Sequence, residues 1–411
     1  MHVVIFEGSR WGSLAPLSLT RPVFMLQCGI GTLMDKQVRA LGPTRITLWV
    51  RPQMEEFCKR VILPRSKIPT RVNEPLDDEP ALLCSGRTLH FSKFEAPTDE
   101  CVAVDEGDVV RMAYVKRPGL SHADAMTRSP KWTALLELPH GMSQARLAEY
   151  AWDLTNWNEE AIVADSMALR DVKKLPDDGP YHVVDRDDVL LTGDDVRLEP
   201  GCVLDASRGP VVLGRGARVG AGSVLEGPCY IGDYTRIAPL TAVRSGTTIG
   251  PACNIGGAVS NSIILGFSDK PFEGYLGDSY VGEWTNLGAG TTTANVKTTY
   301  GEIGVQIGSK QIKTGRRSMG AIIGDHTKTS IGTRLTPGCY VGCCCMLVGQ
   351  GLVPRFVPSF SFWSDQGPQK LEIDRFIDVT KRVFDRRDRK WTAVEEQAMR
   401  HAAEAAPAVE Q

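Results

Sequence analysis

The chain has 411 residues, which is too long for one typical hydrophobic core, so two or three domains are expected. With 42% hydrophobic and 23% charged residues it has the composition of a globular protein, and its formal net charge of −2 gives no reason to expect nucleic acid or an anionic membrane as a partner. Eleven cysteines and an N-terminus without the features of a secretory signal favour a reduced, cytoplasmic setting, and no apolar run approaches the length of a membrane span.

The first 145 residues are predicted to form an α/β domain. Strands are expected at residues 2–6, 46–50, 101–104 and 109–115, and helices at 31–41 and 53–61. Strands that alternate with helices favour a mainly parallel sheet with helices on its faces. Residues 146–188 are predicted as a linker with a helical segment, in which the polar and aromatic stretch 149–156 is followed by a break at 177–180.

An aliphatic residue occupies every sixth position between residues 213 and 255. These positions are Leu213, Val219, Leu225, Ile231, Ile237, Val243, Ile249 and Ile255. The period fits neither the helical repeat nor the simple alternation of a strand, and it is the hexapeptide signature of a parallel β-helix. Coils are expected to begin near Leu190, and the β-helix domain is predicted to span residues 189–360.

Two interruptions of this repeat mark expected loops. Residues 260–274 are richer in polar side chains and are predicted to leave the helix, and a second excursion is predicted from about residue 291 to residue 320. The repeat returns in the final coils with Leu335, Val341, Leu347 and Val353. Because a regular coil offers only a flat wall, loops that leave the coils are the expected walls of an active-site pocket.

Residues 361–411 are predicted to form a helical tail, because apolar side chains recur there near helical spacing. The tail also carries a basic cluster, which consists of Arg382, Arg386, Arg387, Arg389 and Lys390. Such a cluster is typical of a solvated helix face, and the alternative is a grip on the phosphates of a nucleotide or coenzyme.

Three consecutive cysteines, Cys343, Cys344 and Cys345, are predicted to pack as small buried residues. Neighbouring residues on a strand point to opposite faces, so three in a row converge poorly on one ion, whereas metal sites favour spaced pairs. The sequence therefore favours packing over a metal centre at this point.

Six short segments carry the most specific signal. They are Leu19-Thr20-Arg21-Pro22-Val23, Tyr150-Ala151-Trp152-Asp153-Leu154, Gly266-Phe267-Ser268-Asp269-Lys270, the run at 280–291, Ile323-Gly324-Asp325-His326-Thr327-Lys328-Thr329, and Phe356-Val357-Pro358-Ser359-Phe360. Together they resemble the GlmU-like family, in which sugar nucleotidyltransferases are fused to acetyltransferases. The resemblance covers nearly the whole chain and is most specific in the C-terminal half.

The resemblance implies a fold and two reactions. The expected fold is a Rossmann-like α/β nucleotidyltransferase domain followed by a left-handed parallel β-helix, assembled as a homotrimer. The expected reactions are acetyl transfer from acetyl-CoA to an amino-sugar 1-phosphate such as glucosamine 1-phosphate, and uridylyl transfer from UTP to N-acetylglucosamine 1-phosphate, which gives UDP-N-acetylglucosamine. Mg²⁺ is implied for the second reaction.

For acetyl transfer, the resemblance implies two sets of contacts on the β-helix. The substrate contacts are Arg244, Tyr275 and Asn286, and the coenzyme contacts are Ala289, Asp325 and Cys343. The histidine that serves as base in the better-known enzymes aligns with Phe272, which cannot accept a proton, and a phosphate-binding lysine falls near Ser262.

Three other residues are candidates to replace the missing groups. Glu273 is the nearest substitute base, and Lys270 is a candidate point charge for a phosphate. His326, the only histidine of the β-helix proper, is a second catalytic candidate because it stands in the Gly-Asp-His-Thr-Lys-Thr motif.

For nucleotidyl transfer, the segment Gly8-Ser9-Arg10-Trp11-Gly12 follows the first strand and is a weak match to the glycine-rich loop of the usual pyrophosphorylases. Arg21 and Lys36 match the family's pattern and are expected to contact phosphates, with surface ion pairs as the alternative. Metal ligands are not assigned, although Asp105 and Asp108 follow an apolar strand, where carboxylates would be useful.

Three interpretations of the function stay open. The first is a cytoplasmic enzyme of sugar-nucleotide biosynthesis with both halves active. The second keeps one half active, or uses another acceptor sugar or nucleotide base, because Phe272 removes the expected base. The third is a non-catalytic trimeric scaffold that binds sugar nucleotides.

Overall fold

The N-terminal domain is built on a six-stranded sheet with the order β5-β4-β1-β6-β9-β8. The computed structural model describes residues 1–76, 79–107, 109–141, 145–170, 172–176 and 178–411. The strands are β1 (His2–Phe6), β4 (Arg45–Trp49), β5 (Thr70–Val72), β6 (Ala81–Ser85), β8 (Cys101–Asp105) and β9 (Val109–Val115). The first four run parallel, and β9 and β8 extend the sheet in antiparallel pairing. The predicted strands and the mainly parallel sheet are confirmed, whereas the prediction missed the short β5 and also β6, a buried run without alternation.

Helix α1 (Leu33–Leu41) confirms the first predicted helix. Thr32 and Asp35 form a capping box at its start, and Gly42 ends it in the left-handed conformation with φ of 56°. The second predicted helix is reduced to α2 (Glu55–Phe57) and a wider turn at Cys58–Ile62. The remaining short elements of the domain are β2 (Gln27–Cys28), β3 (Gly31–Thr32), β7 (Thr88–Leu89), α3 (His122–Thr127), α4 (Pro130–Thr133) and β10 (Arg146–Leu147).

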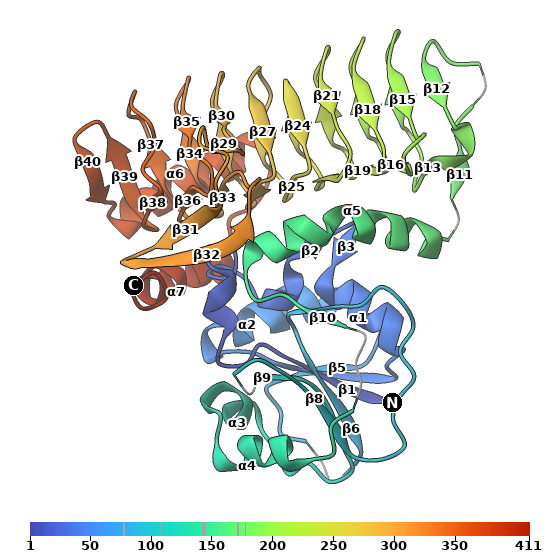
Figure 1. The fold of residues 1–411 in the computed structure, drawn as a ribbon, viewed down its shortest axis with the longest axis vertical. Helices are drawn as coiled ribbons and strands as arrows, with labels where there is room; N and C mark the ends of the chain where they lie inside the picture. The colour runs from blue at the N-terminus through green and yellow to red at the C-terminus, as the bar shows by residue number, and fades with distance from the viewer. Residues whose placement is uncertain (77–78, 108, 142–144, 171, 177) are drawn as a thin grey trace.

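The C-terminal half is a left-handed parallel β-helix with three walls, which extends along one side of the molecule in Figure 1. The first wall contains β11 (Lys173–Lys174), β13 (Val189–Leu191), β16 (Val211–Leu213), β19 (Cys229–Ile231), β22 (Thr247–Ile249), β25 (Ile263–Ile264), β28 (Tyr280–Val281), β33 (Ile322–Ile323), β36 (Tyr340–Val341) and β38 (Phe356–Val357). The second wall contains β14 (Arg197–Leu198), β17 (Arg218–Val219), β20 (Arg236–Ile237), β23 (Asn254–Ile255), β26 (Asp269–Lys270), β29 (Asn286–Leu287), β34 (Lys328–Thr329), β37 (Met346–Leu347), β39 (Ser361–Ser364) and β40 (Gly367–Lys370). The third wall contains β12 (His182–Val184), β15 (Val203–Asp205), β18 (Val224–Glu226), β21 (Ala242–Val243), β24 (Ala258–Ser260) and β27 (Tyr275–Gly277), and further along the chain β30 (Thr292–Thr293) pairs with β35 (Arg334–Leu335).

The six-residue repeat forms the core of this β-helix, as predicted. All eight aliphatic positions belong to one hydrophobic cluster and are at most 3% exposed. Leu335, Val341, Leu347 and Val353 continue the cluster in the final coils. Each coil therefore seals its interior with one aliphatic side chain per wall, and neighbouring coils share the burial.

The two predicted interruptions behave differently. Residues 260–274 do not leave the helix, so that prediction is wrong: β25 and β26 keep them in the walls. The coil is shorter there, since the paired residues Ile249 and Ile264 lie 15 positions apart whereas Ile231 and Ile249 lie 18 apart. The second excursion is confirmed, because the chain leaves the coil after β30 and forms a hairpin of β31 (Ile303–Ile307) and β32 (Lys310–Arg316).

Helix α5 (Ala151–Ala168) lies between the two halves of the molecule, along one flank of the β-helix (Figure 1). Its buried side chains Trp152, Leu154 and Ala161 share one hydrophobic cluster with residues of β2 and of the first wall, including Tyr280. The helix therefore joins the N-terminal domain to the β-helix through a continuous core.

The tail forms α6 (Ile373–Arg386) and α7 (Ala393–Val409), so its helical prediction is confirmed from residue 373 onward. It is wrong for residues 361–370, where β39 and β40 extend the second wall of the β-helix. Phe376 and Ile377 are buried with Cys343, Cys344 and Phe360 in one cluster, so the first two cysteines of the row pack as predicted. Cys345 lies in the β-helix core. Among the described helices none is both long and apolar enough to cross a membrane.

Candidate functional site

A small hollow lies at the carboxyl end of two neighbouring parallel strands of the N-terminal sheet. The loop after β1 contributes Gly8 and Arg10, and the turn after β6 contributes Arg87. Ligands of open α/β sheets bind at this edge, because the loops that follow parallel strands converge there. The hollow holds about 30 Å³, so it suits a phosphate-sized group, and the rest of a ligand would lie on the open surface.

Three arginines, Arg10, Arg87 and Arg128, line this hollow and give it positive charge. Arg87 is buried; its Nη1 donates to the Ala148 carbonyl oxygen at 3.1 Å, and its Nε has no partner among the described protein atoms. Burial and the charge of Arg10 lower the pKa of Arg87 to about 10. Arg10 is half-exposed and has only a loose ion pair with Glu149, at 3.8 Å. The geometry fits an anion that approaches both groups.

Of the predicted glycine-rich segment, Gly8 and Arg10 line the hollow, whereas Gly12 does not and lies against Val409. Arg87 was not predicted. The only signal for Arg87 is its place directly after a buried strand, two residues beyond Ser85. A lone arginine in a turn carries no motif, and its role depends on which strand lies beside β1.

The carboxylates near the hollow are engaged elsewhere. Glu7 forms a buried ion pair with Arg51, with 2.5 Å between Oε1 and Nη1, and accepts the backbone N–H groups of Val23 and Arg51. Asp105 is paired with Arg111 at 3.0 Å, and Asp108 lies outside the described residues. In the described part of the chain no three His, Cys, Asp or Glu side chains gather as a metal site would require, so these residues do not fit the implied Mg²⁺.

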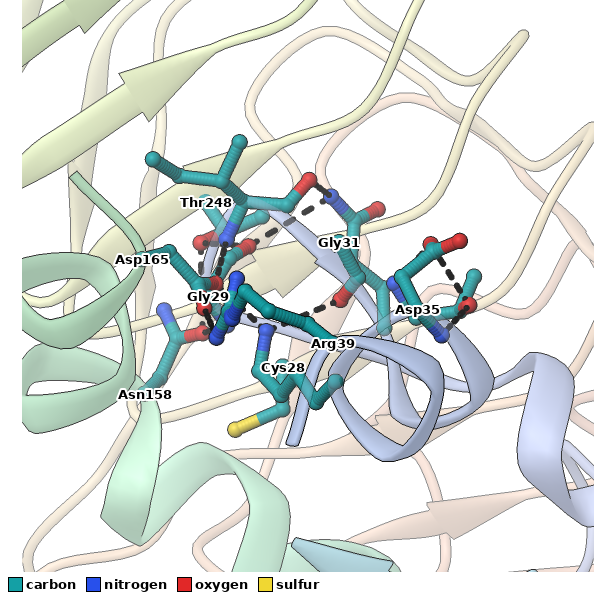
Figure 2. A network of polar contacts seen from close by, with 12 residues as sticks. Cys28, Gly29, Gly31, Asp35, Arg39, Asn158, Asp165 and Thr248 are labelled. Atoms are coloured by element: carbon teal, nitrogen blue, oxygen red, sulfur yellow. Dashed lines mark hydrogen bonds and ion pairs between the residues drawn. The ribbon is translucent and has the colours of Figure 1, made fainter. Parts of the chain in front are cut away.

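Lys36 does not contact this hollow, which corrects the prediction for it. Its ammonium is buried in an ion pair with Asp165 of α5, and Arg39 binds the same carboxylate at 2.6 Å (Figure 2). The backbone N–H of Ile30 also donates to Asp165, at 2.8 Å. Lys36 therefore anchors α1 to α5, and at 1% exposure it is not accessible to a phosphate.

Asn158 of α5 extends the same network to the β-helix (Figure 2). It accepts from the Gly29 backbone N–H at 2.6 Å and donates to the Gly246 carbonyl oxygen at 2.7 Å, while the Thr248 hydroxyl donates to the Gly29 carbonyl oxygen at 3.0 Å. Gly29 has φ of 71°, and a Cβ there would lie 2.5 Å from a carboxylate oxygen of Asp165. Only glycine fits between these partners.

Arg21 is the second predicted phosphate contact that the structure places in an ion pair. It is 9% exposed and binds Asp325 and, at 3.2 Å, Glu283. Burial lowers the pKa of Arg21, but the two carboxylates outweigh burial and raise it. Asp325 also accepts the Thr20 hydroxyl and the Glu283 backbone N–H. The expected coenzyme contact at Asp325 is thus a bond between the domains.

The remaining coenzyme-side residues do not gather into a site within one chain. Cys343 is fully buried and its backbone N–H donates to the Ser359 hydroxyl at 2.9 Å, so it cannot face a coenzyme. Ala289 is partly exposed at the corner between the second and third walls, where its carbonyl oxygen accepts from Gly332. Asn286 is exposed on β29, between Asp269 and Lys328 of the neighbouring coils.

Lys270 is not positioned to bind a phosphate group. It pairs in register with Ile255, so its side chain takes an inward position of the coil, and it is 2% exposed. Its ammonium donates to the carbonyl oxygens of Gly256, Phe272 and Gly274 at 2.8, 3.1 and 2.8 Å. Burial lowers the pKa of Lys270 to about 8, although Glu273 raises it. All three donors are used to hold the shortened coil.

Three predicted residues do lie near each other at the third wall. Tyr275 begins β27, and its hydroxyl is 3.4 Å from the Asn295 amide. Burial raises the pKa of Tyr275, whereas the exposed Arg244 nearby lowers it. Glu273 is exposed in the preceding turn, beside Phe272, which is 55% exposed.

His326 lies away from this group, at the corner between the first and second walls. Its ring is parallel to Trp284 and lies 6.4 Å from Phe384 of α6, and burial lowers its pKa to about 3, despite the opposing effect of Asp325. The neutral ring is therefore packed among aromatic groups and does not share a site with Glu273.

Comparison with known proteins matches residues 3–173 to the sugar nucleotidyl transferase family model. A bifunctional sugar-1-phosphate nucleotidylyltransferase/acetyltransferase of Sulfurisphaera tokodaii is 35% identical over 152 residues, which are 36% of this chain and 38% of that protein. The bifunctional protein GlmU of Methanocaldococcus jannaschii is 34% identical over 131 residues, 32% of this chain and 31% of its own. The matches thus span less than two fifths of these relatives.

Among solved structures, Arabidopsis UDP-N-acetylglucosamine acyltransferase covers 56% of this chain and 92% of its own with 14% identity and a TM-score of 0.22, too low a likeness to support an inference. The matched residues 3–173 comprise the α/β domain and helix α5. Residues 3–173 therefore match the sugar nucleotidyl transferase family, and parts of the chain are similar to bifunctional GlmU proteins.

Proposed function

We propose that this protein is a transferase of sugar-nucleotide biosynthesis whose N-terminal domain transfers a nucleotidyl group to a sugar 1-phosphate. The observation that carries the proposal is the pair Arg10 and Arg87 at the carboxyl edge of β1 and β6, within the residues that match the sugar nucleotidyl transferase family. The relative from Sulfurisphaera tokodaii, a bifunctional sugar-1-phosphate nucleotidylyltransferase/acetyltransferase, supports the same class of reaction.

Nucleotidyl transfer requires mainly that the protein position the two substrates and stabilise negative charge. A phosphate oxygen of N-acetylglucosamine 1-phosphate attacks the α-phosphorus of UTP; the new P–O bond forms, the bond to the β-phosphate breaks, and pyrophosphate leaves with its electrons. Arg10 and Arg87 would stabilise the charge that gathers on the phosphate oxygens.

Acetyl transfer is the second candidate activity, favoured by the neighbouring Arg244, Glu273 and Tyr275 at the third wall. The amine of glucosamine 1-phosphate would attack the thioester carbon of acetyl-CoA, forming a C–N bond and breaking the C–S bond. Glu273 would accept the amine proton, and the departing thiolate would take up a proton from water. The homotrimer remains part of this proposal, because the coenzyme groups do not come from the same corner of one chain.

The nucleotidyl half is tested by pyrophosphate release from UTP and N-acetylglucosamine 1-phosphate, with other nucleoside triphosphates as further arms. Arg87→Ala should lower the rate by about 10²–10³, the effect of losing one preorganised charge-stabilising donor. Arg218→Ala, at an exposed position of β17, is the matched control and should leave the rate unchanged. No pyrophosphate release from any triphosphate, or an unchanged rate in Arg87→Ala, would overturn the assignment.

The acetyl half is tested by thiol release from acetyl-CoA in the presence of glucosamine 1-phosphate and other amino sugars. Glu273→Gln should lower the rate by about two to four orders of magnitude if Glu273 is the base. Glu226→Gln, which changes a carboxylate on β18, is the control. If no amino sugar gives thiol release, only the nucleotidyl transfer activity remains proposed. If neither reaction occurs but ligands still stabilise the protein against unfolding, the non-catalytic scaffold is favoured.

A further inference from the structure

A second cavity lies where three parts of the molecule meet. It holds about 450 Å³, within the range of small-molecule sites, and shares no lining residue with the hollow at Arg10 and Arg87. Arg21 and Arg65 line it from the N-terminal domain, Trp284 and His326 from the β-helix, and Arg389 and Lys390 from the segment between α6 and α7. A ligand in this cavity would touch all three parts at once.

One side of the cavity is aromatic. Phe267 and Trp284 occupy equivalent corners of neighbouring coils and stack at 4.5 Å between ring centroids, and Phe384 stacks on Trp284 at 4.0 Å. The corner residues adopt φ near 60°, which turns their side chains outward in register along the helix edge. This side offers an apolar surface to the organic part of a ligand.

The polar part of the cavity is formed by cationic side chains that lack carboxylate partners. In the described part of the chain, neither Arg65 nor Lys390 has an acidic group within ion-pair distance, and Arg389 packs over the Phe267 ring at 4.9 Å. The acidic groups of the cavity are engaged: Asp325 and Glu283 bind Arg21, and Glu395 accepts the Thr392 hydroxyl at 2.6 Å. The cavity therefore has four basic side chains against three acidic ones, and Arg65, Arg389 and Lys390 have no carboxylate partner among the described residues.

Two buried polar atoms at the cavity have no protein partner. They are Arg21 Nε and His326 Nδ1, and no described protein atom forms a hydrogen bond with either. A buried donor without a partner costs about 1–3 kcal/mol, so such atoms are expected where a ligand supplies the missing acceptor. Arg21 Nε carries a hydrogen that no described protein atom accepts.

We propose that this cavity binds a small organic phosphate, whose phosphate group is held by Arg65, Arg389 and Lys390 and whose organic part lies against Trp284. Unbalanced arginine and lysine charges select a polyvalent anion, and the aromatic side selects a molecule larger than phosphate itself. A nucleotide and a sugar phosphate share this chemistry. The bound molecule bridges the N-terminal domain, the β-helix and the tail, so its binding stabilises their docking.

The test uses the full chain and isothermal titration with three probes: UDP, N-acetylglucosamine 1-phosphate and inorganic phosphate. The background is Arg87→Ala, which weakens the hollow in the N-terminal domain. Within it, the double variant Arg65→Glu/Lys390→Glu reverses two exposed charges of the cavity. The control Arg382→Glu/Arg386→Glu reverses two exposed charges of the same tail that do not line the cavity.

At least one organic probe should bind in the Arg87→Ala background, bind at least tenfold more weakly in the cavity double variant, and bind within twofold in the control. UDP and the sugar phosphate as separate arms identify the organic part. The proposal is overturned if no organic probe binds in that background, if the cavity variant binds as well as the control, or if inorganic phosphate binds as tightly as both organic probes.

Tryptophan fluorescence gives an independent measurement if Arg87→Ala does not fold. Trp284 lines the cavity and Trp132 lines the N-terminal hollow. Quenching by the organic probe should be lost in Trp284→Phe and kept in Trp132→Phe. The reverse pattern would assign the binding to the hollow and refute the cavity site.

Discussion

The ion pair between Arg21 and Asp325 should be one of the strongest single links between the two halves of the molecule. Arg21 is 9% exposed and Asp325 is 1% exposed, so removal of either partner leaves the other charge buried. Such a loss typically costs about 3–5 kcal/mol. Glu283 remains 3.2 Å from Arg21 and is one-third exposed, so Asp325→Asn should fall near the lower limit, at about 3 kcal/mol.

A double-mutant cycle with Arg21→Met and Asp325→Asn measures the pair directly. Denaturant unfolding of the wild type, the two single variants and the double variant should give a coupling energy of about 2 kcal/mol, because the double variant no longer buries an unpaired charge. The exposed pair Arg146 and Glu160, with contacts at 2.7 and 3.0 Å, is the control and should give less than about 1 kcal/mol.

A coupling below about 0.5 kcal/mol between Arg21 and Asp325 would refute this reasoning. A different result would restore the coenzyme role expected from the motif: Asp325→Asn would then raise the KM for acetyl-CoA in the thiol-release assay while the free energy of unfolding stayed unchanged. The two measurements therefore separate a structural link from a ligand contact at the same residue.

Three further predictions concern stability. Burial lowers the pKa of His326 from 6.5 to about 3, so the unfolded state takes up the proton first as pH falls below 6.5. Between pH 6.5 and pH 5 the free energy of unfolding of the wild type, measured with urea, should fall by about 2 kcal/mol relative to that of His326→Phe. An equal dependence of this free energy on pH in both proteins would contradict the prediction. Gly29→Ala should destabilise the protein by more than about 1 kcal/mol and by more than Gly42→Ala, because both positions have positive φ but only Gly29 also lacks space for a Cβ; equal melting temperatures would contradict the steric argument. Ile249→Ala should cost about 2–5 kcal/mol in denaturant unfolding, whereas Leu240→Ala, at an 83% exposed position, should stay within about 0.5 kcal/mol; similar losses at both positions would disprove the inward assignment of the repeat.

The β-helix could be predicted from the sequence because its period reports which residues point inward. An aliphatic side chain every six positions is needed on each wall, so the pattern persists whatever the outer residues are. The break in this pattern at residues 260–274 led to the wrong prediction of a loop, because a coil can have fewer residues at its corners while its strands still pair within the walls. Lys270 then stands at an inward position, where periodicity expects an aliphatic residue and the structure uses carbonyl oxygens to bind its ammonium.

The candidate site was harder to predict, because charged residues in motifs look alike whether they bind a ligand or each other. Arg21 and Asp325 stand in two of the six motifs, and only the fold brings them together. Lys36 and Asp165 are a similar pair, joined through α5. Arg87 was missed for the opposite reason, since it belongs to no motif and gains its place from the pairing of β6 with β1.

The spacing of contacts along the chain has a consequence for the order of folding. Neighbouring coils pair residues such as Cys229 and Thr247, 18 positions apart, so the β-helix can grow one coil at a time by short loop closures. The ion pair of Arg21 can form only after Asp325, 304 positions further along the chain, has been synthesised, and the tail is synthesised later still. During synthesis the N-terminal domain therefore leaves the ribosome first, and the face that docks on the β-helix stays uncovered until most of the protein has been made. This face is the surface most in need of protection during synthesis.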